Sequence, residues 1–132
     1  FGKENPMEAT AKGWSDFGGK VEGNETPYRA ALREGGEELT GFLGDSKQLH
    51  THIKTHGGHY KLQHNSYHVH MFYLPYDENL PKYYNLNHQF LWERMNKEVL
   101  NKSRLFEKIE IKWFSIEEIK NNIKEHDYRL KM

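Results

Sequence analysis

Residues 19–41 of the chain read GKVEGNETPYRAALREGGEELTG, a glycine-rich loop that leads into a run of clustered carboxylates. Thr26 and Pro27 predict the start of a helix, because threonine is a good N-cap and proline is tolerated at the first helical position. Apolar and small side chains then recur at helical spacing, which predicts a helix over Pro27–Leu39. Gly41 is expected to end it.

Two glycines stand inside this predicted helix. Gly35 and Gly36 each cost about 1 kcal/mol relative to alanine in a helix interior. We expect close packing of the helix on a neighbouring sheet to offset that cost.

Three carboxylates of the helix share one surface. Glu34, Glu37 and Glu38 are spaced at i, i+3 and i+4, so a helix stacks them together although their charges repel. A hard divalent cation relieves this repulsion, since Mg²⁺ prefers carboxylate oxygens, phosphates and water. Gly18-Gly19 in the loop lets backbone approach a ligand closely. The alternative is an ordinary solvated acidic face.

The same stretch resembles a known family. Gly19, five residues, Glu25, seven residues and then Arg33-Glu34-Gly35-Gly36-Glu37-Glu38 match the Nudix box, which is Gly-x5-Glu-x7-Arg-Glu-apolar-x-Glu-Glu-x-Gly-apolar. The preceding Trp-Ser-Asp-Phe-Gly-Gly also resembles the lead-in of many members. Two positions depart from the pattern: Gly35 fills the apolar slot, and Thr40 stands where the family has glycine.

The resemblance implies a fold and an activity. The fold is an α/β (α+β) Nudix-type α/β/α sandwich, with a mixed sheet between helices, in a single domain over residues 1–132. The first residues read like the end of a strand, so we expect the N-terminal strand to be truncated. The activity is divalent-metal-dependent hydrolysis of a phosphoanhydride bond in a nucleoside diphosphate linked to another moiety.

The resemblance also implies residue roles. Glu34, Glu37 and Glu38 would bind Mg²⁺ or Mn²⁺ together with a backbone carbonyl, of Gly18 or Gly19, with Gly19 preferred. Glu37 would thereby be catalytic. Glu25 and Arg33 would form an ion pair that fixes the loop on the helix.

A general base often comes from outside the box. In part of the family a glutamate lies six residues before a tryptophan, and Glu107 stands in this relation to Trp113. The resemblance therefore makes Glu107 a candidate catalytic base. The plain alternative is a surface salt bridge at a strand end.

Substrate contacts are expected from the loop and its lead-in. Trp14 and Phe17 offer surface for stacking a base, and Lys20 offers a cation for phosphate. Tyr67, Phe72 and Tyr73 could also offer surface for stacking a base. The competing interpretation is that they are core residues, as aromatic side chains on strands more often are.

Histidines are concentrated between His50 and His70. His52 and His56 are spaced for one helix face, and His68 and His70 for one strand face, so a metal site is conceivable. A loop that lines an anionic pocket, or plain exposed residues, are the alternatives.

The rest of the chain mixes strands and helices. Alternation predicts strands at Tyr67–Tyr73 and Ile109–Phe114, and helical spacing predicts a helix over Leu86–Asn101. Ser115 and Glu118 predict a capping box that opens a last helix. The polar segment Gln48–Leu62 is expected to be a hairpin or long loop.

Composition limits the remaining options. Lysine plus arginine and aspartate plus glutamate both number 19, so no global basic field attracts nucleic acid. There is no cysteine, which excludes a disulfide scaffold. No apolar run is long enough to span a membrane, and a cytoplasmic protein is the default expectation.

Two rival functions remain open. One is removal of a capped RNA end, which needs a basic groove; the lysines and arginines of the second half are dispersed: Lys97, Lys102, Arg104, Lys108 and Lys112. The other is a non-catalytic nucleotide-binding module of the same fold. The sequence indicates a nucleotide-type partner in each case and leaves the oligomeric state open.

Overall fold

The computed structural model describes residues 1–5, 13–103, 106–122 and 128–129. These residues form two compact units, one within 17–76 and one that combines the described parts of 1–16 and 77–131. No helix within the described ranges is long and apolar enough to cross a bilayer.

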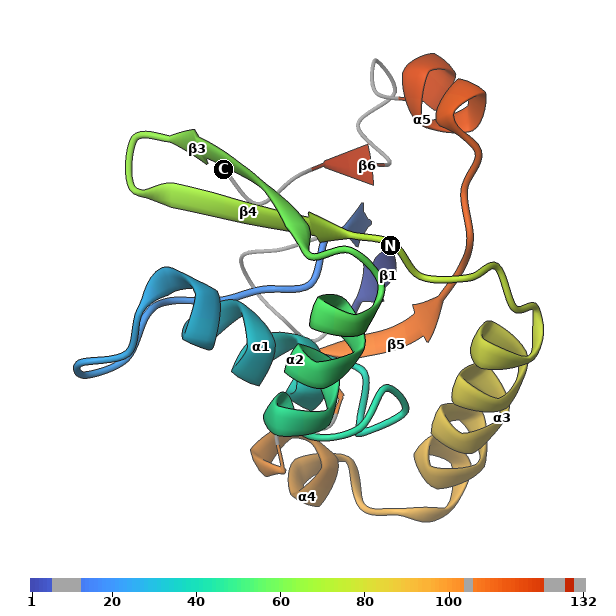
Figure 1. Ribbon diagram of the computed structural model, residues 1–132. Coiled ribbons are helices and arrows are strands. Elements are labelled where there is room, and N and C mark those ends of the chain that lie inside the picture. Colours follow the sequence, from blue (N-terminus) through green and yellow to red (C-terminus); the bar gives the residue numbers. More distant parts are fainter. Residues whose placement is uncertain (6–12, 104–105, 123–127, 130–132) are drawn as a thin grey trace. The chain divides into compact units, whose positions relative to one another are not determined.

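The 17–76 unit consists of two helices and a hairpin. Its elements are α1 (Pro27–Glu38), α2 (Ser46–Thr55), β3 (His59–His64) and β4 (Tyr67–Phe72). The two strands form a long antiparallel ribbon that follows directly on α2 (Figure 1). Leu32 of α1 packs with Leu49 and Ile53 of α2, and Phe72 at the end of the ribbon covers this core. The amphipathic face predicted for α1 is therefore buried against α2.

Both ends of α1 agree with the predicted signals. The Thr26 hydroxyl accepts a hydrogen bond from the Arg29 amide at 3.1 Å, so Thr26 is the N-cap with proline next to it. At the other end the Gly41 amide donates to the Gly36 carbonyl at 3.0 Å with a φ of 75° at Gly41. Thr40 also has a positive φ, 54°. The position where the Nudix pattern has glycine thus adopts a backbone that favours glycine.

Helix α2 corrects the expectation of a hairpin or loop beginning at Gln48. Asp45 accepts from the Gln48 amide at 2.8 Å, and the Gln48 side chain accepts from the Asp45 amide at 2.9 Å. This reciprocal pair is a capping box with aspartate in place of serine or threonine. Leu49 and Ile53, four residues apart, supply the buried stripe. The polar composition of this segment did not indicate a helix, because only Leu49 and Ile53 supply its buried apolar face.

The glycines inside α1 have a different neighbour from the predicted sheet. A Cβ on Gly35 would lie 3.6 Å from Leu49 Cδ2, and one on Gly36 would lie 3.7 Å from the Gly44 carbonyl oxygen. Both are ordinary contact distances, so close packing does not require glycine at either position. The neighbour of Gly35 is helix α2.

The second unit contains a mixed four-stranded sheet. Its strands are β1 (Gly2–Glu4), β2 (Trp14–Ser15), β5 (Lys108–Ile111) and β6 (Tyr128–Arg129), in the order β5-β1-β2-β6. The β2–β6 pair is parallel, and the β1–β2 and β1–β5 pairs are antiparallel. The predicted class, mixed α/β with a mixed sheet, is confirmed.

Three helices complete this unit: α3 (Asn79–Arg94), α4 (Lys97–Lys102) and α5 (Ile116–Asn122). The single helix predicted over Leu86–Asn101 is wrong, because α3 begins seven residues earlier and Asn96 caps a separate helix by accepting from the Glu98 amide at 2.8 Å. Ser115 and Glu118 form the predicted capping box, with hydrogen bonds of 3.1 and 3.2 Å.

Candidate functional site

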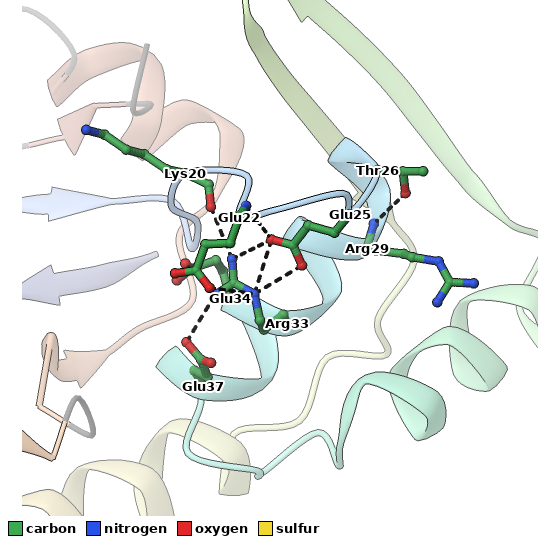
Figure 2. Close-up of polar contacts among 8 residues, drawn as sticks. All are labelled: Lys20, Glu22, Glu25, Thr26, Arg29, Arg33, Glu34 and Glu37. Carbon is green, nitrogen blue, oxygen red and sulfur yellow. Dashed lines mark hydrogen bonds and ion pairs between the residues drawn. The ribbon is translucent and has the colours of Figure 1, made fainter.

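Arg33 is the centre of a group of carboxylates on α1 and the preceding loop. Its guanidinium lies 2.8 Å from Glu25, 2.9 Å from Glu34, 3.5 Å from Glu37 and 3.9 Å from Glu22, measured between nearest nitrogen and oxygen atoms. Figure 2 shows these side chains converging on the guanidinium from the loop and from the helix. One cation therefore faces four anions.

The Glu25 pair attaches the loop to the helix. Arg33 Nη2 donates to Glu25 Oε1, and Arg33 Nε donates to Glu25 Oε2 at 3.2 Å, which is a bidentate arrangement. Arg33 Nη2 also donates to the Lys20 carbonyl at 3.1 Å, and the Glu22 amide donates to Glu25 at 2.8 Å. The hydrogen bonds from Arg33 and from the Glu22 amide hold the pKa of Glu25 below its usual value. These contacts fix the course of residues 20–25.

A fifth carboxylate, that of Glu38 on α1, lies close to Glu34 of this group. Oxygens of Glu34 and Glu38 lie within 4.8 Å of each other, and the side chain of Glu38 is almost fully buried. The Gly18 amide donates to Glu38 at 3.3 Å. At Gly19 a Cβ would lie 2.3 Å from Glu34 Oε1, so this carboxylate occupies space that only glycine leaves open. Gly18 and Gly19 therefore pack directly against the carboxylates of Glu38 and Glu34.

The arrangement fits a divalent cation. Two carboxylates within 4.8 Å repel unless a cation or proton lies between them, and the single guanidinium is already shared among four carboxylates. Hard oxygen ligands of this kind suit Mg²⁺ or Mn²⁺. Glu37, which is 43% exposed, leaves an open side on which a phosphate or water can approach. Glu34 and Glu38 lie close enough to share such an ion, and the role of Glu37 as a ligand stays a prediction.

The predicted substrate contacts have varied surroundings. The Trp14 ring lies edge-on to Phe114, with 5.2 Å between ring centroids, so part of its surface packs within its own unit. Phe17 is half-buried and Lys20 is exposed. The contact that Lys20 makes in the site uses its backbone carbonyl. Their role toward substrate stays a prediction.

Glu107 lies immediately before β5 in the other unit, and its side chain is half-buried. Its carbonyl accepts from the Asn5 amide at 3.1 Å. The assignment of Glu107 as base stays a prediction.

The histidine-rich segment is regular structure rather than a loop. His52 and His56 stack on α2 with ring centroids 4.2 Å apart, and His59 of β3 stacks on Tyr28 at 4.5 Å. Burial, reinforced by the neighbouring His59, Lys61 and His68, lowers the pKa of His70 and favours its neutral form. Through the described part of the chain no three histidines converge on a shared point.

One of the lysines considered for a basic groove is not at the surface. Lys108 is fully buried, so it cannot contribute to a basic groove. Arg104 lies outside the described residues.

Sequence reasoning missed Glu22, and it expected Gly18 to contribute a carbonyl rather than its amide. Glu22 approaches Arg33, and its amide holds Glu25; the amide of Gly18 holds Glu38. The signal for the first was present in Glu22-Gly23-Asn24-Glu25, where the Glu25 amide closes a turn onto the Glu22 carbonyl at 3.2 Å.

A glycine-rich loop that an arginine ties to a helix rich in carboxylates is an arrangement suited to binding a divalent cation and phosphate. The model of the NUDIX domain family matches residues 3–131, so the chain belongs to the Nudix family. No curated protein and no solved structure matches it. Membership implies a pyrophosphohydrolase acting on a nucleoside diphosphate linked to another moiety, with a divalent metal as the typical cofactor.

Proposed function

We propose that the chain is an active hydrolase that cleaves the phosphoanhydride bond of a small nucleotide, with the metal held on α1. Glu34, Glu37 and Glu38 would be the carboxylate ligands, joined by the Gly19 carbonyl. The observation that carries the proposal is the surplus of negative charge around Arg33, which approaches four carboxylates while Glu34 and Glu38 converge beside it. A non-catalytic domain has no physical reason to keep this repulsion.

A bound metal would supply positive charge and would activate a water molecule. Bound Mg²⁺ or Mn²⁺ would neutralise phosphate oxygens and make a bound water more acidic. The chain's own residues supply the rest. Arg33 keeps Glu34 and Glu37 oriented, and its contacts with Glu25 keep the glycine loop against the helix.

Glu107 would act as general base. In the proposed reaction its carboxylate takes a proton from water as the water oxygen attacks one phosphorus. The anhydride P–O bond then breaks, and the leaving phosphate keeps the bonding electron pair. A positioned base of this kind contributes about 10²–10⁴-fold to a rate. Trp14, Phe17 and Lys20 would bind the nucleotide.

The test is a substrate panel. Nucleoside triphosphates, ADP-ribose, dinucleoside polyphosphates and capped RNA are each incubated with Mg²⁺ or Mn²⁺, and products are identified by mass. The proposal expects cleavage of a small nucleotide between two phosphorus atoms. Preference for capped RNA would favour the decapping alternative. Tight binding of a nucleotide with no cleavage of any compound would favour the non-catalytic module and contradict the proposal.

A further inference from the structure

A buried polar network joins strands β1 and β2 to the start of β5. Lys108 Nζ donates to Glu4 Oε1 at 2.7 Å and also to the Ser15 hydroxyl, and this hydroxyl donates to Glu4. The side chains come from β5, β1 and β2, and those of Lys108 and Ser15 are fully buried. Burying an ammonium group is costly, and an apolar pair of similar volume is often as stable or more so. Stability alone is therefore a weak reason for this network.

The network lies at a break in strand register. Lys3 pairs with Glu110, but the next residue, Glu4, pairs with Lys108, so Ile109 is an extra residue in β5. Such a bulge changes which side of the sheet the adjoining side chains face. The ion pair joins the two residues that face each other on the far side of the bulge. The ion pair therefore lies directly next to the register shift.

The two residues just before Lys108 are also held by hydrogen bonds. The buried Asn5 side chain donates through Nδ2 to the Phe106 carbonyl at 2.8 Å, and the Asn5 amide donates to the Glu107 carbonyl at 3.1 Å. Both peptide groups around Glu107 are thus tied to β1 or its continuation. These contacts fix the backbone at Glu107 and therefore the direction of its Cα–Cβ bond.

We propose that the Lys108–Glu4–Ser15 network, together with Asn5, is a positioning device for the Glu107 carboxylate. The inference rests on the proposed function, because it assigns a purpose to holding Glu107. Lys108 is a positioning residue, since its ammonium is buried and bound to Glu4 and Ser15. An ion pair suits this purpose better than apolar side chains, because its directed hydrogen bonds specify one register.

The experiment replaces the pair with apolar residues and follows the chemical step. The double variant Lys108→Met/Glu4→Leu keeps side-chain volume while removing the directed bonds. The matched control is Lys3→Met/Glu110→Leu, which makes the same change at the cross-strand pair on the other side of the bulge. Thermal unfolding, kcat and KM are measured for each, alone and combined with Glu107→Gln.

Misplacement of a catalytic group by about 1 Å can cost up to 10²-fold in rate, so the Lys108→Met/Glu4→Leu variant should lose about 10- to 10²-fold in kcat. Its KM should stay close to that of the wild type, and it should still fold, with an unfolding midpoint that is lower because the buried Ser15 hydroxyl loses both partners. In the Glu107→Gln background the same change should cost almost nothing more, since the positioned group is already gone. The Lys3→Met/Glu110→Leu control should keep the wild-type kcat.

Three results would overturn the inference: a stable Lys108→Met/Glu4→Leu variant with wild-type kcat, losses that multiply with those of Glu107→Gln, or full activity of Glu107→Gln itself. If the double variant does not fold, Ser15→Ala, which removes one hydroxyl from the network, is read in the same cycle with the same criteria. Failure of the proposed function looks different: the wild type would cleave nothing, or Glu38→Gln would cleave as well as the wild type.

Discussion

The arginine cluster on α1 and the lysine network of β1, β2 and β5 are built from the same kinds of side chains. Arg33, 22% exposed, is shared among four carboxylates, whereas the buried Lys108 is matched by Glu4 and a neutral hydroxyl. The first cluster has negative charge left over and an open side. The second is balanced and closed. A cluster with more carboxylates than cations at a surface can bind a further cation, whereas a buried ion pair mainly holds the strands that carry it.

The largest effect is expected where the unmatched charge is removed. Glu38→Gln should reduce kcat by orders of magnitude, because a metal ligand is lost, while the Gly18 amide can still donate to the glutamine oxygen. The fold should persist, and stability without metal should not fall, because like-charge repulsion is relieved. Steady-state kinetics and thermal unfolding measure both. Glu37→Gln should behave in the same way.

The matched control is Glu22→Gln, which removes the same charge beside the same arginine from a side chain that is 61% exposed. It should keep most of the activity. Equal losses in Glu38→Gln and Glu22→Gln would mean that total charge matters and that the ligand positions are wrong.

A smaller effect should follow from filling the space beside Glu34. In Gly19→Ala the new Cβ would lie 2.3 Å from the Glu34 carboxylate and must displace it. We expect weaker Mn²⁺ binding, measured by titration calorimetry, and a higher metal concentration for half-maximal activity. Gly18→Ala is the comparison, since nothing lies within 4 Å of a Cβ there. Similar metal affinity in both variants would show that the position of Glu34 is not critical.

Loss of Arg33 should act mainly on stability. Arg33→Ala leaves Glu25 without its bidentate partner and should lower the unfolding midpoint at neutral pH. Because the pKa of Glu25 is depressed in the folded state, the pair stabilises above the ordinary glutamate pKa and loses its effect as pH falls through the depressed value. The difference from the wild type should therefore shrink in acid.

Arg94→Ala serves as the control, because Arg94 is 55% exposed and lies 3.7 Å from an equally exposed Glu93. Its effect should stay within about 0.5 kcal/mol. An Arg33→Ala variant as stable as this control would mean that the loop is held by other contacts.

The smallest effect concerns the end of α1. Thr40→Gly should stabilise the protein by about 1 kcal/mol, because a β-branched residue is strained at a φ of 54°. Thr51→Gly, within helix α2, should destabilise the protein by about 0.5 kcal/mol, because glycine is the poorer helix former of the two. Chemical denaturation distinguishes the two signs. A destabilised Thr40→Gly variant would show that contacts of the threonine side chain outweigh the backbone strain.

The features that could be predicted from the sequence are those that depend on local signals. The caps of α1 and α5, strand β4 and the Glu25–Arg33 spacing depend on residues close together in the chain, and the structure has each of them. Helix α2 was missed because an aspartate capping box and two apolar residues were hidden among histidines and lysines.

Non-local features could not be predicted in the same way. The burial of Lys108 depends on pairing with Glu4, a residue 104 positions away, and on a bulge that no pattern in β5 indicates. From the sequence it counted as one more dispersed surface cation. The acidic site itself was predictable because its members lie within some twenty residues of one another.

The central claim is that the unmatched carboxylates on α1 hold a divalent cation that hydrolysis requires. The most direct measurement is turnover of the best substrate from the panel after exhaustive chelation, followed by titration with Mg²⁺ and Mn²⁺. We expect no turnover after chelation, recovery on addition of either ion, and no recovery in Glu38→Gln at metal concentrations that saturate the wild type. Turnover that survives chelation, or a Glu38→Gln variant restored in parallel with the wild type, would contradict it.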